Sequence, residues 1–419
     1  MDRTHAITAD DRYVVISSDC HAGASIPAYG DYLEARHRDD FASWEASFVN
    51  PYDDLVDTEA LQYRRNFDGA IRQRELEADG IVAEVVYPNT IPPFFPSGTL
   101  TLPAPSAEQY ELRWAGIRAH NRWLADFCNE LPGRRAGVAQ LLLNDLDDAM
   151  AETRRVKEAG LFGGVMIPNL APDDDLPPLH APVYEPLWAL CEELGLPVNM
   201  HGGTGVPNLG PYPATPILMF MEFGWYAQRP LLRLMFSGVF ERHPDLTFVM
   251  TEQGSSWVPG LLAGLDWAVD RTTIAGSVEE RFGGEIVRSL SLKPSEYWAR
   301  QCFLGASFMG PHDCAVREET GVDTIMWGSD YPHSEGTHPY TMEALRYTFA
   351  DVDPGEVRAM LGTNAARAYG FDLDALSRLA AEIGPHVADV AVPLSDDEFP
   401  TDALSPALDR MKKPVGNIS

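Results

Sequence analysis

Short apolar segments rich in β-branched residues recur along this chain, and segments with a helical repeat lie between them. Eight apolar runs can be recognised, at residues 13–18, 81–87, 137–143, 164–167, 197–200, 246–250, 302–305 and 324–327. Near-continuous apolar strands that alternate with helices are typical of a parallel sheet covered on both faces. Eight such units predict a closed (β/α)8 barrel, the TIM-barrel class of α/β fold.

The open, doubly wound parallel sheet is the alternative fold. It calls for a glycine-rich phosphate loop after the first strand, and the sequence DCHAGAS that follows residue 18 is not such a loop. The barrel is therefore the favoured prediction. Amphipathic patterns predict its main helices at 107–130, 147–159, 184–194, 231–242 and 342–350.

We predict one metal-dependent barrel domain over residues 1–384 and an acidic C-terminal tail over 385–419 that covers the surface or a partner subunit. A barrel of this class takes about 250 residues, and more when its loops are long. The extra length falls into a polar insertion at 22–75, a proline-rich loop at 88–106 and a Gly/Pro-rich aromatic loop at 202–229. Loops that follow barrel strands build pockets and lids.

The formal charge of −30 indicates that nucleic acid and anionic membranes are not partners, because both attract basic surfaces. The N-terminus has no apolar signal region, and no apolar run approaches the ~18 residues of a membrane span. Five scattered cysteines form no CxxC pair, which disfavours a disulfide framework and a thiolate zinc site. We therefore expect a cytoplasmic protein.

Polar side chains stand at the ends of four predicted strands. Asp19 and His21 end the first, His201 the fifth, Glu252 the sixth and Asp330 the eighth. The carboxyl ends of barrel strands converge on one mouth, so these residues are expected to meet there. Asp19 and His21 are two positions apart and point to the same side of a strand. The pattern predicts a metal site formed by all five residues.

Two imidazoles and three carboxylates suit iron, manganese or zinc. Five ligands exceed what a catalytic zinc takes, which favours an iron-like, manganese-like or dinuclear centre. We also predict catalytic roles for Glu252, Asp330 and His333, the last as a proton donor, a supporting residue or a sixth ligand. Each residue has a simpler interpretation: an aspartate after a strand can cap a helix, a glutamate can be solvated, and a histidine can be an ordinary loop residue.

Other residues near the predicted mouth carry weaker signals. Glu84 in the second strand can point toward the site or away from it. The aromatic residues expected to form an apolar pocket wall are Tyr212, Phe220, Trp225 and Trp257, although aromatics more often belong to a core.

Several longer motifs resemble the amidohydrolase superfamily, in particular its branch related to aminocarboxymuconate-semialdehyde decarboxylase. They are ISSDCHAG, ELGLPVNMHGG, GVFERHPDLTFVMTEQGSSWVP, IMWGSDYPHSEGTHP and LGTNAARAYGFD, and the likeness spans residues 13–372. The resemblance implies a metal at the barrel mouth. By it, Asp19 and His21 stand at the first-strand His-x-His of the family, His201 at the fifth-strand histidine, Asp330 at the eighth-strand aspartate, and Glu252 where the decarboxylases have a histidine.

Two of these positions thus carry a carboxylate in place of histidine. This departure is similar to the non-heme diiron monooxygenases of diterpenoid antibiotic biosynthesis on the same fold. That likeness implies two iron ions, dioxygen, and a hydrophobic diterpenoid substrate held as a coenzyme A thioester. The alternative is a hydrolase or decarboxylase that uses zinc or manganese on a small carboxylate, amide or ester. In it, Asp330 acts as general base and His333 as acid. A barrel that only binds a ligand is a third hypothesis. The long loops and tail favour a homodimer.

Overall fold

The computed structural model describes residues 8–50, 61–97 and 102–409. Its strands run parallel to their neighbours in the order of the sequence. The strands of the described residues are β1 (Val15–Ala22), β2 (Ile81–Pro88), β3 (Arg135–Gly137), β4 (Ala139–Gln140), β5 (Val165–Met166), β6 (Val198–His201), β7 (Phe248–Thr251), β8 (Cys302–Ser307) and β9 (Ile325–Gly328). Each predicted run contains a strand or overlaps one.

Hydrogen bonds close these strands into a barrel. One sheet has the order β1-β2-β3 and the other β4 to β9. Val138 lies between β3 and β4, and its amide donates to the carbonyl of Val86 at 2.9 Å. At the other seam the Asp330 amide donates to the Asp19 carbonyl at 2.8 Å, and the His21 amide to the Tyr331 carbonyl at 2.7 Å. With β3 and β4 counted as one interrupted strand, the predicted (β/α)8 barrel is confirmed.

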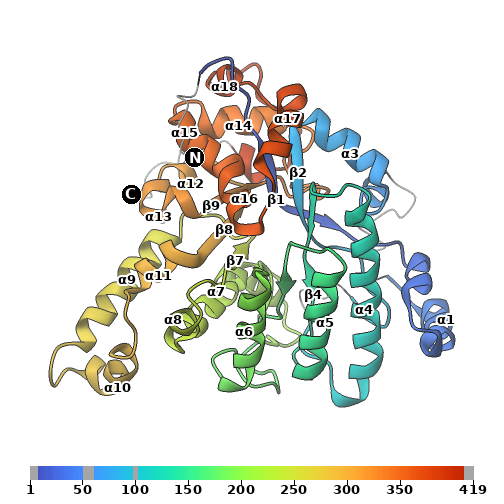
Figure 1. The fold of residues 1–419 in the computed structure, drawn as a ribbon, viewed down its shortest axis with the longest axis vertical. Coiled ribbons are helices and arrows are strands. Elements are labelled where there is room, and N and C mark those ends of the chain that lie inside the picture. Colours follow the sequence, from blue (N-terminus) through green and yellow to red (C-terminus); the bar gives the residue numbers. More distant parts are fainter. Residues whose placement is uncertain (1–7, 51–60, 98–101, 410–419) are drawn as a thin grey trace.

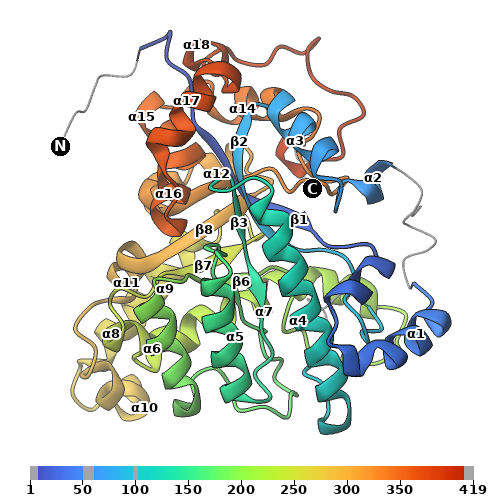
Figure 2. The same ribbon diagram turned by 45° about the vertical axis from the view of Figure 1, so that its right-hand side comes forward.

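Helices cover the outside of the barrel, and α4, α5 and α6 lie side by side along it in Figures 1 and 2. The longer helices are α1 (Arg38–Ser47), α3 (Gly69–Ala78), α4 (Ala107–Asn129), α5 (Leu146–Glu158), α6 (Glu185–Leu194), α7 (Thr215–Phe236), α9 (Val258–Thr272), α10 (Val278–Val287), α11 (Pro294–Gln301), α14 (Thr341–Phe349) and α17 (Leu373–Ile383). Shorter ones are α2 (Leu61–Arg64), α8 (Val239–Arg242), α12 (Pro311–Cys314), α13 (Arg317–Thr320), α15 (Pro354–Arg358), α16 (Asn364–Tyr369) and α18 (Val387–Val390).

Local sequence explains where the predicted helices begin and end. Ser106 and Gln109 form a capping box at the start of α4, and Asp145 accepts the amide of Asp148 at the start of α5. Helix α6 ends at Gly195, whose φ of 59° is open to glycine at little cost. These helices match the sequence prediction to within a residue or two.

The segment 202–229 departs from the prediction of a loop, because α7 occupies its second half. Most of its glycines and prolines precede Thr215, and Pro216 sits in the first turn, where a missing amide costs nothing. The rest of α7, residues 217–236, contains four leucines and three methionines, which favour helix. Strand β1 is also longer than predicted, so Asp19 and His21 lie inside the strand.

The insertion and the tail both pack against the barrel where they are described. The insertion forms α1, α2 and the start of α3, while residues 51–60 lie outside the described residues. In the tail, His386 forms a β-bridge with Arg12, which precedes β1, and Ala407 and Leu408 are buried against Ala344. The division of the chain at residue 384 stays a prediction.

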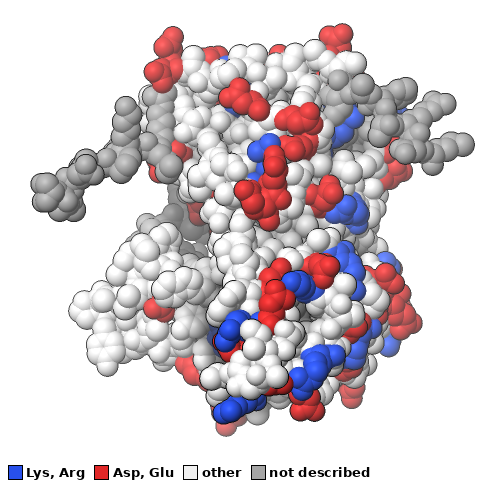
Figure 3. All heavy atoms as spheres, turned by 90° about the vertical axis from the view of Figure 1, so that its left-hand side faces the viewer, with Lys and Arg blue, Asp and Glu red and all other residues white. Residues whose placement is uncertain are grey.

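Exposed large apolar side chains concentrate on α7 and α10. Figure 3 shows a face on which acidic and basic groups are interspersed, beside a lobe with almost no charge. The exposed large apolar residues of the two helices are Ile217, Leu218, Phe220, Met221, Trp225, Val278, Phe282 and Ile286. Helix α10 also exposes Arg281 and Glu285. No helix among the described residues is long and apolar enough to cross a bilayer.

Candidate metal centre

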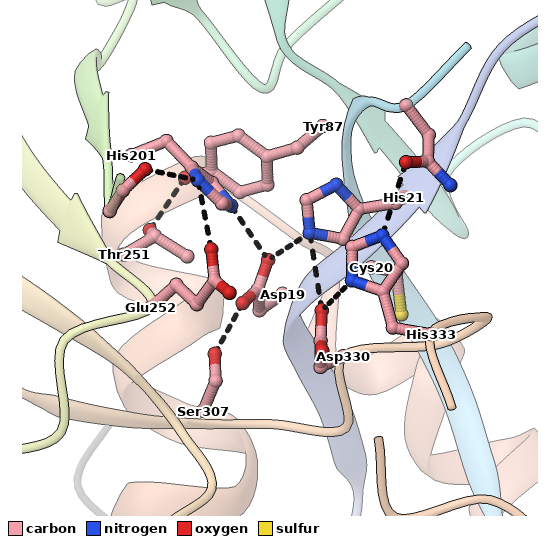
Figure 4. A network of polar contacts seen from close by, with 12 residues as sticks. Asp19, Cys20, His21, Tyr87, His201, Thr251, Glu252, Ser307, Asp330 and His333 are labelled. Atoms are coloured by element: carbon pink, nitrogen blue, oxygen red, sulfur yellow. Dashed lines mark hydrogen bonds and ion pairs between the residues drawn. The ribbon is translucent and has the colours of Figure 1, made fainter. Parts of the chain in front are cut away.

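Four of the five predicted ligands meet at the mouth of the barrel (Figure 4). Asp19 and His21 come from β1, His201 is the last residue of β6, and Asp330 follows β9. Nε2 of His21 lies 3.3 Å from Oδ1 of Asp19 and 3.2 Å from Oδ1 of Asp330. Nε2 of His201 lies 3.6 Å from the same Asp19 oxygen. All four side chains are at most 1% exposed.

The second nitrogen of each histidine is held by the protein. Nδ1 of His21 is 3.1 Å from the carbonyl of Pro88, and Nδ1 of His201 is 3.1 Å from the carbonyl of Gly202. A carbonyl accepts only from an N–H, so each pair favours the tautomer with its proton on Nδ1 and a free Nε2. This is how metal-binding histidines are oriented.

The atoms that face the centre of this cluster have no hydrogen-bond partner. They are Oδ1 of Asp19, Nε2 of His21 and Nε2 of His201, and Oδ2 of the adjoining Asp330 is also without a partner. A buried polar atom without a partner costs about 1–3 kcal/mol. Three of them, on Asp19, His21 and His201, lie close enough together to bind one ion, and Asp330 adjoins them through His21. This imidazole and carboxylate chemistry fits a divalent transition metal. The residues present therefore suit a metal ion.

Charge within the cluster is strongly coupled. Burial would raise the pKa of Asp19, but His21 and His201 hold it well below its usual range. Burial would lower the pKa of His21, whereas Asp19 and Asp330 raise it well above the usual value. The Ser307 hydroxyl also donates to Asp19. The metal-free site thus favours an ionised Asp19 and a protonated His21, and a metal bound at Nε2 of His21 would displace its proton.

Glu252 lies beside the cluster rather than within it. Its Oε2 is 3.1 Å from Nδ1 of His201, the nitrogen turned away from the other ligands, and 25% of its side chain is exposed. Burial raises the pKa of Glu252, with Asp330 and Asp19 adding to the shift and His201 opposing it. Its predicted role as a ligand stays a prediction.

His333 extends the cluster toward the pocket. Its Nδ1 lies 2.9 Å from Oδ1 of Asp330, and its Nε2 lies 3.1 Å from Oδ1 of Asn89. The rings of His21 and His333 are 4.2 Å apart. His21, Asp330 and His333 form a second group with ligand spacing, which shares His21 with the group of Asp19 and His201.

The sequence interpretation missed several residues that support the site. Asn89 directly follows the end of β2, and Ser307 ends β8, so both stand at strand ends like the predicted ligands. Their neutral side chains gave no sign of chemistry. Glu84, which was left open, does not belong to either group of candidate ligands and instead binds Arg72 and Arg135.

The cluster lies at the wall of a cavity of about 740 Å³. Of the four predicted wall aromatics, Phe220 lines it, together with Phe223 and Phe308, which were not foreseen. Tyr212 and Trp225 are exposed, and Trp257 packs on Trp298. Among the described residues that line the cavity, none is Lys or Arg.

Backbone strain marks the same edge of the barrel. Glu252, Phe308 and Asp330 follow β7, β8 and β9 and have φ values of 59°, 59° and 57°. Non-glycine residues in this region cost about 1–3 kcal/mol each, and such strain clusters at functional sites. Three successive strand ends therefore hold their side chains in conformations that the local sequence does not favour.

A model of the amidohydrolase family matches residues 36–371. The chain belongs to the amidohydrolase family. Among curated proteins, it is 26% identical over 287 residues to gamma-resorcylate decarboxylase of Rhodococcus jostii (strain RHA1), covering 65% of this chain and 83% of that protein. It is 26% identical over 289 residues to the enzyme of the same name from Rhizobium radiobacter, covering 65% and 82%.

Solved structures support the same fold. 5-Carboxyvanillate decarboxylase from Sphingomonas paucimobilis superimposes with a TM-score of 0.59 at 20% identity, over 86% of this chain and 100% of that one. An amidohydrolase from Mycobacterium avium subsp. paratuberculosis K-10 gives 0.63 at 18% identity, over 85% and 99%. A manganese complex of 5-carboxyvanillate decarboxylase from Novosphingobium aromaticivorans DSM 12444 gives 0.63 at 19%, over 87% and 100%. The predicted amidohydrolase-type barrel is thus confirmed.

Proposed function

We propose that this amidohydrolase is a divalent-metal-dependent decarboxylase of an aromatic carboxylate. The observation that carries the proposal is the pair of overlapping ligand groups beside a large cavity. Asp19, His21, His201 and Asp330 are buried, and each has an unpartnered ligand atom. The curated relatives named gamma-resorcylate decarboxylase support the reaction. Manganese, present in a related solved structure, is the first metal to test, with zinc second.

The cavity supports a substrate that is mostly apolar. Its volume of about 740 Å³ lies within the ~300–1,000 Å³ of ligand pockets. Phe220, Phe223 and Phe308 offer flat apolar contacts for a ring. Since no Lys or Arg is among the described lining residues, a substrate carboxylate would have to bind at the metal centre. The metal, when bound, polarises substrate oxygens and lowers the pKa of a bound water.

The chain's own residues then divide the remaining work. Decarboxylation breaks the bond between a ring carbon and the carboxyl carbon, carbon dioxide leaves, and the ring carbon takes up a proton. His333 faces the cavity and contacts Asp330, so this pair can hold the proton and deliver it to the ring carbon. Asn89 orients the ring of His333 through its Nε2. Phe223 and Phe308, which are less exposed than Phe220, shield the reacting carbon from water.

The test is carbon dioxide release under strict exclusion of oxygen. Protein stripped of metal and reloaded with manganese, zinc or iron is assayed with dihydroxybenzoates and carboxyvanillates, and Asp330→Asn serves as the matched inactive variant. We expect metal-dependent release from at least one aromatic acid. Oxygen uptake without any carbon dioxide release would contradict the proposal.

A second candidate is a non-heme diiron monooxygenase that hydroxylates a hydrophobic diterpenoid, carried as a coenzyme A thioester, with dioxygen in antibiotic biosynthesis. One observation favours it: two ligand groups share His21, and the Glu252 carboxylate lies beside them. A centre of this kind needs two iron ions per chain. Iron-loaded protein that consumes dioxygen with an apolar substrate would support it, and full activity of manganese protein without oxygen would exclude it.

We also infer a homodimer in the cytoplasm. The exposed apolar side chains of α7 and α10 support association, because apolar patches on a soluble protein mark contact surfaces. Light scattering on the purified protein should give twice the mass of 46.3 kDa. A mass of one chain would contradict the dimer and leave the catalytic proposal intact.

A further inference from the structure

Arg72 is an arginine with no exposed surface. It contacts the carboxylate of Glu84 and the two segments that bear His21 and Asp330. It comes from the second turn of α3, which begins after the capping residue Asp68. Its guanidinium binds the carboxylate of Glu84 on β2, with Nε at 2.9 and 2.8 Å from the two oxygens. Glu84 also lies 3.3 Å from Nε of Arg135. This buried ion pair lies outside the candidate ligand groups.

The guanidinium of Arg72 also contacts the backbone of His21, one of the predicted ligands. One terminal nitrogen of Arg72 donates to the carbonyl of His21 at 2.8 Å. The amide of His21 in turn donates to the carbonyl of Tyr331 at 2.7 Å. The peptide groups on both sides of the His21 side chain are thus held, one by Arg72 and one by the residue that follows Asp330.

Arg72 also contacts the segment that carries Asp330. Its guanidinium carbon lies 4.8 Å from the centre of the Tyr331 ring, which is cation–π distance. The Asp330 amide donates to the Asp19 carbonyl at 2.8 Å across the same seam. Arg72 therefore touches the end of β1 and the loop after β9, where three of the four converging ligands are attached.

We infer that Arg72, oriented by Glu84, is a positioning residue that holds His21 and the Asp330–Tyr331 segment in register for metal binding. The inference rests on the proposed metal site. A planar guanidinium can meet a carboxylate, a carbonyl and an aromatic face at once, whereas an ammonium group cannot. Burial lowers the pKa of Arg72, but Glu84 more than restores it, so the pair stays ionised.

The test compares Arg72→Lys with Arg134→Lys. Arg134 is the control, because it likewise joins a carboxylate to a strand carbonyl: Glu77 of α3 at 2.7 Å and Val82 of β2 at 2.8 Å. Its side chain is 20% exposed, so its replacement disturbs the core less. It lies at the opposite end of β2 from the metal centre. Manganese affinity is measured by competition with a chelator, on samples that circular dichroism shows to be folded. Changes in residues that support metal ligands cost about 10- to 100-fold in affinity.

We expect Arg72→Lys to weaken manganese binding at least about tenfold and Arg134→Lys to leave it unchanged. In the metal-free protein, hydrogen exchange of the His21 amide should also be faster in Arg72→Lys alone. If that variant does not fold, Glu84→Gln takes its place, with a smaller loss of affinity expected. It keeps the shape of the side chain and removes the charge that orients Arg72.

Unchanged manganese affinity in the folded Arg72 variant would overturn the inference, even if its exchange is faster. Equal losses in both arginine variants would also overturn it, since they indicate a general loss of stability. If the wild-type protein binds no metal, the proposed function fails. The exchange comparison then still decides whether Arg72 holds His21.

Discussion

Two clusters of buried charge lie close together in this barrel, and they differ in how their polar atoms are satisfied. In the cluster of Arg72, Glu84 and Arg135, the carboxylate has an arginine on each side. In the cluster at the mouth, Oδ1 of Asp19 and Nε2 of both His21 and His201 lie close together with no hydrogen-bond partner. In the first cluster only Nε of Arg135 makes no hydrogen bond, and it lies 3.3 Å from the Glu84 carboxylate, so this cluster needs little beyond protein atoms. The second calls for a ligand, because unpaired buried atoms are costly unless something binds them.

The largest effect should come from removing a predicted metal ligand of the cluster at the barrel mouth. Asp19→Ala, His201→Ala and Asp330→Ala should each lower bound manganese to the background level and abolish turnover, with the far-ultraviolet circular dichroism of the fold retained. Elemental analysis of dialysed protein measures the metal. Glu252→Ala tests the fifth predicted ligand with the same measurement. Full metal content in all four variants would place the site elsewhere.

His333 should affect the reaction more than metal binding. Replacement by Gln removes the group that can hold a proton but keeps the side chain near Asn89 and Asp330. A general acid contributes about 10²–10⁴-fold to a rate, so kcat should fall by that range. Manganese content should stay close to that of the wild type. Loss of metal together with activity would instead make His333 a ligand.

Breaking the cluster of Arg72, Glu84 and Arg135 should lower the free energy of unfolding. Glu84→Ala leaves Arg72 and Arg135 buried with no carboxylate between them, and breaking a buried ion pair costs about 3–5 kcal/mol. Urea unfolding of metal-free protein should show a loss of that size. Glu77→Ala removes a half-buried partner of Arg134 and should cost less than about 1 kcal/mol. Equal losses in Glu84→Ala and Glu77→Ala would mean that the buried ion pair contributes no more to stability than the half-buried one.

Adding metal should stabilise the folded protein, because the ion binds the cluster at the barrel mouth only in the folded state. At a free manganese concentration of 100 times Kd, the free energy of unfolding should rise by about 2.7 kcal/mol. A chelator should reverse the gain, and Asp330→Ala should show none of it. The same gain in that variant would indicate manganese binding at another place.

His120 provides a smaller test among the buried histidines. It is fully buried beside the Tyr29 hydroxyl, and burial lowers its pKa to about 3. Below pH 6.5, His120 therefore binds a proton in the unfolded chain but not in the folded protein. The contribution of His120 to the free energy of unfolding is thus highest at neutral pH and falls as the pH falls. From pH 6.5 to 5 the loss is about 2 kcal/mol. His120→Asn should remove that part of the acid sensitivity in urea titrations, and parallel curves would contradict it.

Local patterns in the sequence were sufficient for the elements of the barrel and for where its ligands attach. Strand runs and helix caps report burial and backbone preference within a few residues, so β2, α4 and α5 were predicted closely. The first part of α7, residues 215–230, was missed because the glycines and prolines before Thr215 outweighed the helix formers after it, whereas its last turns lie in the helix predicted at 231–242. The split of the third strand around Val138 leaves no clear mark in the residues themselves.

The sequence by itself determined that Asp19, His21, His201 and Asp330 would meet, because parallel strands in a closed barrel end at one mouth. Only the tertiary structure decided which atoms face one another, that Glu252 contacts the outer nitrogen of His201, and that Glu84 belongs to Arg72. Those outcomes depend on side-chain rotamers and on partners distant in the chain. A strand pattern tells which face a residue is on, but the neighbours that complete its hydrogen bonds come from the fold.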